Sequence, residues 1–377
     1  MGVGVSALCY SGGGESTSPP ARDKGEVSPE VKRRLASIIV VHYGAYATLS
    51  TCLRSIIRHT SNVEIIVVDN DRLPTSFAQQ FPVVKLIRSG SNIGFGAACN
   101  AGARAASGGV LVFMNNDVEV RAGWLSSLIE PFSSPSVGST CPLIVVRKNP
   151  GAVMAAGGDS DFMALAWNRM TGRGSGTDAD RDGFFYAPGC CVAVRRAAFD
   201  RVGGFDEALF LFLEDVDLSW RLRMGGWRIV YASHSVIHHA WMTSTSKLTP
   251  ADMQYLFNRN RLRLILKNYS GTTVLRIFCT YVVLQTGLIL WIVRRRQVSE
   301  LHAAIAAWLW NLRNIPSTVK ARKSTQIRRK RSDGDVVRFM YDGIAGIHLA
   351  LGTMKHPLYE AYFNRRAKQI SNDAPAA

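Results

Sequence analysis

The stretch SIIVVHYGAYATLSTCLRSIIRHTSNVEIIVVDND, residues 37–71, has the pattern of a strand, a helix and a second strand. The runs 37–41 and 63–68 are short, apolar and rich in β-branched residues, as expected for buried parallel strands. Between them, apolar residues recur at helical spacing over 49–57. Parallel strands need a long crossover, which is usually a helix, so this stretch predicts an α/β domain.

The same alternation continues downstream. The runs 83–87 and 110–114 predict two more strands, and the small residues of 97–106 predict a helix between them. Order is expected to begin at Leu35. In parallel α/β sheets with right-handed crossovers, ligands bind beyond the carboxyl ends of the strands. We therefore expect the binding pocket where these strands end.

Three side chains follow predicted strands directly. They are Tyr43, Asp69 and Asp117. One polar residue after a strand is ordinary turn chemistry, but three at neighbouring strand ends indicate a pocket.

A glycine-containing turn, Gly94-Phe95-Gly96, follows Asn92. It resembles a fragment of a dinucleotide fingerprint but lacks the third glycine. The turn either lets the backbone approach a ligand closely or is purely structural.

The segment GFDEALFLFLEDVDLSWRLR, residues 204–223, places acidic side chains in an apolar setting. Burying an unpaired carboxylate is costly or raises its pKa, so the cluster indicates a base, a metal site or an ion-pair network. Asp217 stands four residues before Arg221, which fits a satisfied helical pair. Glu214 and Asp215 precede the predicted helix, near its positive end. We favour catalysis for them, with a structural acid cluster as the alternative.

The charge of the chain is concentrated near one end. Its 377 residues suffice for one domain of more than 200 residues and an appendage, and the net charge is +17. Residues 294–331 hold eleven Lys and Arg against one acid, Glu300. Such a block binds anionic lipid or nucleic acid, and lipid is favoured because no nucleic-acid motif accompanies it.

An apolar stretch precedes this block at 273–293, with Arg294, Arg295 and Arg296 directly after it. Its length suffices to cross a bilayer. A single crossing, however, puts the domain before it and the basic tail after it on opposite sides. A re-entrant or interfacial helix, or a hairpin with 301–312, resolves the conflict. In that partner segment, Leu301, Ala304, Ile305, Trp308 and Leu312 share one helical face. The alternative is a helical pair packed on the main domain.

Cysteine usage and the N-terminal residues indicate a cytosolic setting. The seven cysteines show neither paired metal spacing nor the density of a disulfide scaffold, which predicts a reducing compartment. Residues 1–34 contain a glycine triplet and two adjacent prolines, and we expect a disordered leader there.

Seven motifs follow one another along the chain: SIIVVHY, VVDN, SNIGFGAACNAG, FMNND, APGCCVAVRRAAFDRVGGFDE, LEDVDLSWRLRMGGWR and VIHHA. In this order they resemble the family-2 glycosyltransferases with a GT-A fold, especially their bacterial rhamnosyltransferase-like branch. The resemblance runs from Ser37 to Asn268. It implies a GT-A domain, a Rossmann-like nucleotide-diphospho-sugar transferase fold, over residues 35–268. Beyond the resemblance, we expect hydrophobic and amphipathic helices at 269–320 that form a membrane-associating appendage, and a basic tail with short helices at 321–377.

The resemblance also implies roles for individual residues. The nucleotide-sugar donor site is implied at Val41, Tyr43, Asp69, Asn92, Gly94, Asn116 and Asp117. A divalent cation, Mg²⁺ or Mn²⁺, is implied at Asp117 with His238 or His239, and it would stabilise the departing diphosphate. Asp215 matches the catalytic base, with Glu214 beside it, and direct attack inverts the anomeric centre. The acceptor side is implied at Gly189, Asp217, Trp220 and Arg221, although Trp220 also fits a core anchor.

Two departures from the family pattern concern the acceptor. The Gln-x-x-Arg-Trp motif of processive synthases does not follow the acidic segment, so we expect one sugar per encounter. Residues 255–263 (YLFNRNRLR) are instead expected to form a basic helix on the acceptor side. Ala240, Trp241 and Met242 replace the small residues that relatives tend to have there, which changes the acceptor-side loop.

The expected function is transfer of a sugar, with L-rhamnose from dTDP-rhamnose as the leading candidate, to a glycan or prenyl-diphosphate-linked acceptor at the cytoplasmic face of the membrane, in cell-surface polysaccharide and cell-wall synthesis. A second hypothesis is a membrane-surface or nucleic-acid binding protein whose acid cluster is structural. A third, a nucleotidyltransferase, predicts pyrophosphate release from a nucleoside triphosphate.

Overall fold

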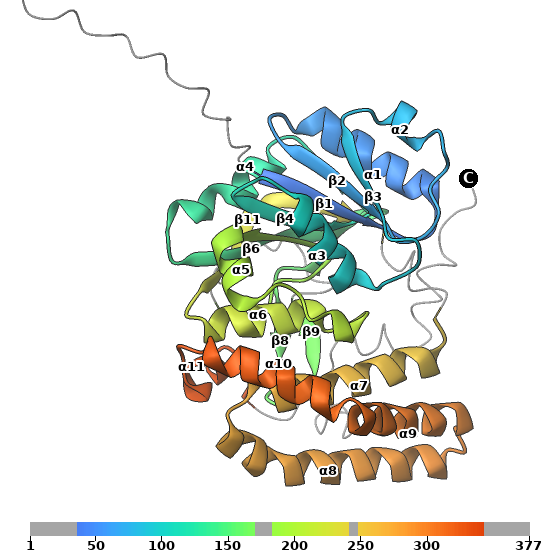
Figure 1. Cartoon of the computed structure of the whole chain (residues 1–377), viewed down its shortest axis with the longest axis vertical. Helices are drawn as coiled ribbons and strands as arrows, with labels where there is room; N and C mark the ends of the chain where they lie inside the picture. The colour runs from blue at the N-terminus through green and yellow to red at the C-terminus, as the bar shows by residue number, and fades with distance from the viewer. Residues whose placement is uncertain (1–35, 170–182, 241–247, 343–377) are drawn as a thin grey trace, which may run out of the picture. The chain divides into compact units, whose positions relative to one another are not determined.

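A mixed nine-stranded sheet forms the centre of the protein (Figure 1). The structure, a computed structural model, describes residues 36–169, 183–240 and 248–342. The strand order is β3-β2-β1-β4-β10-β6-β11-β5, and β7 pairs with β6. The strands of this sheet are β1 (Ala36–His42), β2 (Glu64–Asp69), β3 (Val84–Arg88), β4 (Val110–Asn115), β5 (Val118–Val120), β6 (Val137–Val146), β7 (Asn149–Ala155), β10 (Cys191–Arg195) and β11 (Arg228–His239). A separate two-stranded sheet consists of β8 (Gly158–Ser160) and β9 (Ala166–Asn168).

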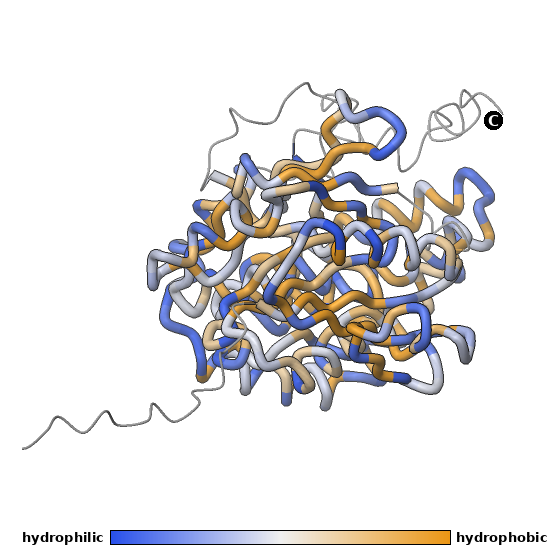
Figure 2. The backbone as a smooth tube through the Cα atoms, turned by 90° about the horizontal axis from the view of Figure 1, so that it is seen from above, coloured by the Kyte–Doolittle hydropathy of each residue, from blue (hydrophilic) through white to orange (hydrophobic). Residues whose placement is uncertain are grey.

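The half of the sheet predicted from the sequence is confirmed. Strands β3, β2, β1 and β4 are parallel and begin and end within one or two residues of the predicted runs. The other half departs from a purely parallel sheet, because β10 runs antiparallel to both β4 and β6. In Figure 2, hydrophobic stretches of the backbone gather towards the middle of the molecule and hydrophilic ones towards its rim.

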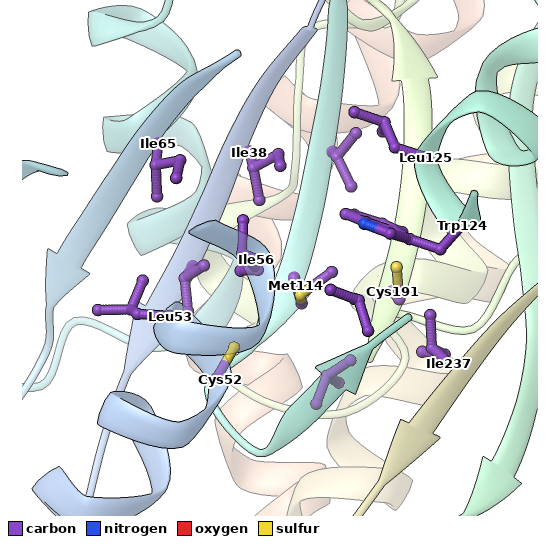
Figure 3. Close-up of a cluster of buried hydrophobic side chains, with 14 of the residues drawn as sticks. Ile38, Cys52, Leu53, Ile56, Ile65, Met114, Trp124, Leu125, Cys191 and Ile237 are labelled. Atoms are coloured by element: carbon purple, nitrogen blue, oxygen red, sulfur yellow. The ribbon is translucent and has the colours of Figure 1, made fainter. Parts of the chain in front are cut away.

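Helices cover both faces of the sheet. They are α1 (Tyr46–His59), α2 (Phe77–Gln80), α3 (Phe95–Ala105), α4 (Trp124–Ile129), α5 (Arg196–Val202) and α6 (Glu214–Met224). Because side chains alternate along a strand, Ile38 packs under α1 and α4 in one core cluster, while Ile39 packs under α3, α5 and α6 in another. Figure 3 shows the first cluster, with Leu53 and Ile56 of α1 and Trp124 of α4 meeting over the strands.

Helices after the sheet form a further layer. They are α7 (Pro250–Asn268), α8 (Gly271–Arg294), α9 (Val298–Arg313), α10 (Ile315–Ile327) and α11 (Asp333–Val337). Figure 1 shows this layer on the side of α6 that faces away from the sheet. A third core cluster joins the two, with Trp220 of α6, Tyr269 after α7 and Tyr281 of α8. The helical layer therefore shares a core with the main domain.

Helices α8 and α9 form the hairpin that was one of the predicted arrangements. The rings of Tyr281 on α8 and Trp308 on α9 lie 6.0 Å apart. The residues predicted to form one interfacial apolar face of α9 differ in burial. Ile305 and Leu312 are exposed, whereas Ala304 is buried together with Ala307 and Asn311. Part of the predicted face is covered because α9 packs on α7 as well as on α8.

Helix α8 is long and apolar enough to cross a membrane, with a mean hydropathy of 1.7 and 17% of its most apolar window buried. It is the one such helix within the described part of the chain. The predicted leader (1–34), most of the predicted basic tail (343–377) and the loop at Trp241 and Met242 lie outside the described residues. Six cysteines within the described part are free thiols.

Candidate active site

The carboxyl ends of β1, β2 and β4 meet at one edge of the sheet. His42 lies opposite Asp69, and Val41 lies opposite Asn115. The backbone N–H of Asn70 donates to the carbonyl of His42 at 2.9 Å, so the first two strand ends are tied together. The predicted meeting of Tyr43, Asp69 and Asp117 at this edge is confirmed, and their roles in binding remain predictions.

Asp69 shapes the turn after β2. Its side chain is buried and accepts hydrogen bonds from the backbone N–H of Leu73 at 3.0 Å and of Asp71 at 3.2 Å. Arg88 lies 3.5 Å from the same carboxylate. These contacts hold the carboxylate at the strand end.

Gly94 meets another loop of the protein. It has φ of +86°, and a Cβ there would lie 2.5 Å from the carbonyl oxygen of Phe210. Asn92 supports the turn, since its Oδ1 accepts from the N–H of Gly94 at 3.0 Å and from Nδ2 of Asn70 at 2.9 Å. Glycine is therefore required by the close approach of Phe210, which is the structural explanation of the turn.

Asp117 and His239 form a contact pair at the same edge. His239 Nε2 lies 2.9 Å from Asp117 Oδ1, and both side chains are buried. The backbone N–H of Ala240 donates to the carbonyl of Asp117 at 3.0 Å, which ties the end of β11 to this turn. Asn116 beside it donates from Nδ2 to the carbonyl of Tyr43 at 3.2 Å. The loops after β1 and β4 and the end of β11 are thus joined.

His238 lies away from this pair. Arg121 donates from Nε to its Nε2 at 3.2 Å. Burial lowers the pKa of His238, and the neighbouring Arg121 lowers it further. Adjacent residues in a strand point to opposite faces, so only one of the two histidines can reach Asp117, and it is His239.

The Asp117 and His239 pair offers one carboxylate oxygen and one imidazole nitrogen to a cation. No group of three or more His, Cys, Asp and Glu side chains is gathered for a metal within residues 36–169, 183–240 and 248–342. Magnesium and manganese in phosphate-transfer sites commonly take one or two protein ligands and complete their shell with substrate oxygens and water. The donor types therefore fit such an ion, with Asp117 and His239 as its holders.

Asp215 is a half-buried carboxylate held by backbone donors. The N–H of Gly189 donates to its Oδ2 at 2.7 Å, and the N–H of Val216 donates to its Oδ1 at 2.8 Å. Burial raises the pKa of Asp215 in spite of these bonds. A positioned carboxylate with a raised pKa suits a general base.

Glu214 is buried beside it. Burial, and then the charge of Asp215, raise the pKa of Glu214 to about 8. Its Oε2 has no hydrogen-bond partner among the described residues. Glu214 therefore carries a proton at neutral pH.

Gly189 and Cys190 connect the two groups of carboxylates, because Gly189 donates to Asp215. Burial, and then Asp117 and Asp215, raise the pKa of Cys190, so both carboxylates lie within electrostatic reach of it. Its carbonyl also accepts from the N–H of Asn115 at 3.0 Å. The strand-end pair and the acidic pair thus belong to one region.

Three predicted acceptor-side residues are in the interior, and their prediction was wrong. Trp220 is fully buried, with its ring 4.7 Å from that of Tyr269. Asp217 is fully buried and pairs with Arg221 at 2.7 Å and with Lys267 at 2.7 Å. These side chains point away from Asp215, because residues two, five and six positions after it in a helix lie on the opposite side of the helix.

The prediction of a basic acceptor-side helix at 255–263 is also wrong, because Arg259 and Arg263 are buried in the interior. Arg263 pairs with Asp206 at 3.0 Å, and Lys267 approaches the same carboxylate at 2.6 Å. The sequence contains a signal for buried charged side chains here. Arg259, Arg263 and Lys267 share one helical face beside Asn260, and the residues around them are apolar.

Replacing Glu214 with Gln is expected to change the pH dependence of stability. Folding raises the pKa of Glu214 from 4.5 to about 8. The proton on Glu214 therefore stabilises the fold fully at pH values below the unfolded-state pKa, and this stabilisation is lost as pH rises through the folded-state pKa. Relative to Glu214→Gln, the wild type should lose up to about 1.4 kcal/mol of unfolding free energy per pH unit in this window. Urea unfolding of both proteins from pH 5 to 9 measures this, and parallel curves would contradict it.

Comparisons with known proteins identify the family of the chain. The model of glycosyl transferase family 2 matches residues 37–203. The N-acetylglucosaminyl-diphospho-decaprenol L-rhamnosyltransferase of Mycobacterium tuberculosis is 31% identical over 232 residues, which cover 54% of this chain and 75% of that protein. A pre-mycofactocin glycosyltransferase of Mycobacterium tuberculosis is 29% identical over 50% of this chain and 39% of its own.

The fold also has a solved counterpart. A crystal structure of GalNAc-T7 with UDP, GalNAc and Mn²⁺ superimposes with a TM-score of 0.50 at 20% identity, over 64% of this chain and 49% of that chain. The likeness supports a GT-A-like fold. The family match and the relatives leave the binding-protein hypothesis without support. The chain belongs to glycosyl transferase family 2 and is a nucleotide-sugar-dependent glycosyltransferase.

Proposed function

We propose that this enzyme transfers one sugar, with inversion, from a nucleotide-diphosphate donor to a lipid-linked acceptor in cell-surface polysaccharide synthesis. L-rhamnose from dTDP-rhamnose is the proposed donor sugar. The single observation that carries the proposal is the 31% identity to a rhamnosyltransferase named for a decaprenyl-diphosphate-linked substrate, over 75% of that protein. The contact of Asp117 with His239, and the adjacent residues Gly189 and Cys190 that bond to Asp215 and Asn115, support it independently.

The proposed chemistry divides between two groups of side chains. A divalent cation, when bound, would supply positive charge to the departing diphosphate. Asp117 and His239 would hold it. Asp215 would accept the proton of the acceptor hydroxyl as that oxygen attacks the anomeric carbon, and its two backbone donors would keep it oriented.

Glu214 and Gly189 support the base. The proton held by Glu214 removes a second negative charge beside Asp215, and the N–H of Gly189 fixes one oxygen of Asp215. The proposed donor site is formed by Val41, Tyr43, Asp69, Asn92, Gly94 and Asn116. Asn92 and Gly94 contribute through the loops that they hold together.

Thermal stabilisation of the purified protein by nucleotide sugars tests donor and metal binding. A ligand that binds the folded state raises its apparent stability by mass action, by about 2.7 kcal/mol at a hundred times Kd. We expect dTDP-rhamnose to raise Tm more with Mn²⁺ or Mg²⁺ present than with EDTA, and Asp117→Ala to abolish the difference. Glu119→Gln is the matched control, because Glu119 pairs at the surface with Arg147. No shift with any donor in a folded sample would contradict the proposal.

We also propose that α8 and its neighbours attach the enzyme to the cytoplasmic face of a membrane. Leu275, Val283 and Leu290 of α8 are all more than 60% exposed, and apolar side chains of α9 are exposed too. The three arginines at 294–296 follow directly. An exposed apolar helix with a basic end suits an anionic bilayer surface.

Vesicle flotation tests this attachment. Each arginine near an anionic surface contributes about 1 kcal/mol, so replacing Arg294, Arg295 and Arg296 with Gln is expected to weaken binding to phosphatidylglycerol vesicles by roughly a hundredfold. Phosphatidylcholine vesicles serve as the control for the apolar contribution. Wild-type protein that stays in solution with both lipids would contradict the proposal.

A further inference from the structure

The loop directly before the acidic pair has an unusual backbone. Phe210, Phe212 and Leu213 have φ of +64°, +69° and +65°. Bulky residues rarely adopt this left-handed region, and a chain keeps it only where the surroundings enforce it. Helix α6 begins at the next residue with Glu214 and Asp215. The shape of this loop therefore determines where Asp215 is placed.

Asn260 on α7 holds this loop from one side. Its Nδ2 donates to the carbonyls of Leu209 at 3.0 Å, Leu211 at 2.9 Å and Phe212 at 2.8 Å. The side chain is fully buried. Its Oδ1 accepts from Nε of Arg259 at 3.0 Å, which fixes the nitrogen end of the amide towards the loop.

The start of α3 holds the loop from the other side. The N–H of Phe95 donates to the carbonyl of Phe210 at 2.8 Å, and Gly94 leaves room for that carbonyl. The loop is thus fixed between α3 and α7. Within the described residues, Asn260 is the side chain that contacts the most carbonyls of this loop.

We infer that Asn260 is a positioning residue for Asp215, acting through the loop at 209–213. The inference rests on the proposed role of Asp215 as the base. Asn260 is fully buried, so it does not meet substrate. It enforces a backbone that the loop residues do not favour by themselves, and a base displaced by about 1 Å can lose about a hundredfold in rate.

The test compares Asn260→Ala with Asn311→Ala. Asn311 on α9 is similarly buried, and its Nδ2 donates to the carbonyls of Arg259 at 3.0 Å and Ala307 at 2.9 Å, not to the loop. The assay is transfer from dTDP-L-rhamnose to a polyprenyl-diphosphate-linked N-acetylglucosamine. We expect Asn260→Ala to lower kcat about 10- to 100-fold with the donor-induced Tm shift unchanged, and Asn311→Ala to keep kcat. Asn260→Asp, which keeps the shape of the side chain but has no N–H to donate to the loop carbonyls, should lose kcat as Asn260→Ala does.

A double-mutant cycle separates this inference from the proposal beneath it. In the Asp215→Asn background, Asn260→Ala should cause no further loss, because both changes remove the same contribution. Asp215→Asn that keeps full kcat overturns the proposed base itself. If Asp215→Asn is inactive, the positioning role is overturned by any of three results: full activity of Asn260→Ala, equal losses in Asn260→Ala and Asn311→Ala, or failure of both Asn260 variants to fold while Asn311→Ala folds.

Discussion

Asp215→Asn is expected to lower kcat by about 10²- to 10⁴-fold, which is the usual contribution of a general base. The amide keeps the shape of the side chain but cannot take a proton from the acceptor hydroxyl. The N–H groups of Gly189 and Val216 donate to different oxygens of Asp215, so asparagine keeps an acceptor for one of them and loses the other, and the side chain should stay anchored by the remaining bond. Steady-state transfer kinetics with the purified variant measure the loss.

The control for this variant is its stability. Burial raises the pKa of Asp215, which means that the fold disfavours its charge, and a neutral amide removes that cost. The amide also leaves one backbone N–H without its acceptor, so the two effects oppose each other and Tm should change by no more than a few degrees. The donor-induced Tm shift should also remain, because the proposed metal holders Asp117 and His239 are untouched. Activity that survives in Asp215→Asn would assign the base elsewhere.

Asp217→Asn is expected to have the opposite profile, with a destabilised fold. Asp217 accepts from Arg221 and from Asn268, and Lys267 lies against it at 2.7 Å. Removing its charge leaves Arg221 buried without a counter-charge and leaves Lys267 with Asp206 alone, and breaking a buried pair in this way costs about 3–5 kcal/mol. For a domain of this size the expected fall in Tm is ~5–10 °C. Differential scanning calorimetry measures it.

The pH dependence of stability supplies a second readout for Asp217. Burial raises its pKa, but Arg221 and Lys267 more than offset this, so the pKa is lowered. The stabilisation is therefore present above the unfolded-state pKa and is lost as pH falls through the folded one. Asp200→Asn, at an exposed site on α5, is the matched control and should change stability by no more than about 0.5 kcal/mol. An Asp217→Asn protein as stable as the Asp200→Asn control would contradict a stabilising role for the ion pairs of Asp217 with Arg221 and Lys267.

The contrast between these two aspartates shows where sequence patterns reach their limit. Both lie in one apolar run, and the sequence pattern distinguishes them only by the spacing of Asp217 to Arg221, a pair that the structure contains. Their roles differ because they lie on different faces of α6, and a second cation on Asp217 comes from Lys267, 50 positions along the chain. Pairings over such separations are decided by how α7 packs, which local periodicity does not contain.

The sheet also has a part that the sequence predicts and a part that it does not. Strands β1, β2, β3 and β4 were predictable because each is a short apolar run followed by a polar turn, and parallel neighbours place these turns together. Strand β10 is equally apolar, but its antiparallel position between β4 and β6 depends on a long connection. Gly94 was visible as a turn, whereas its partner Phe210 was not, since nothing in the sequence links them.

The measurement that tests the central claim most directly is sugar transfer itself, with wild type and Asp215→Asn compared in the same assay. Purified protein is incubated with labelled dTDP-L-rhamnose, a divalent cation and a polyprenyl-diphosphate-linked N-acetylglucosamine in anionic vesicles, and the lipid fraction is counted. We predict label in the lipid with wild type, an inverted anomeric configuration in the product, and at least a hundredfold less label with Asp215→Asn. A product of retained configuration, or equal transfer by both proteins, would contradict the account.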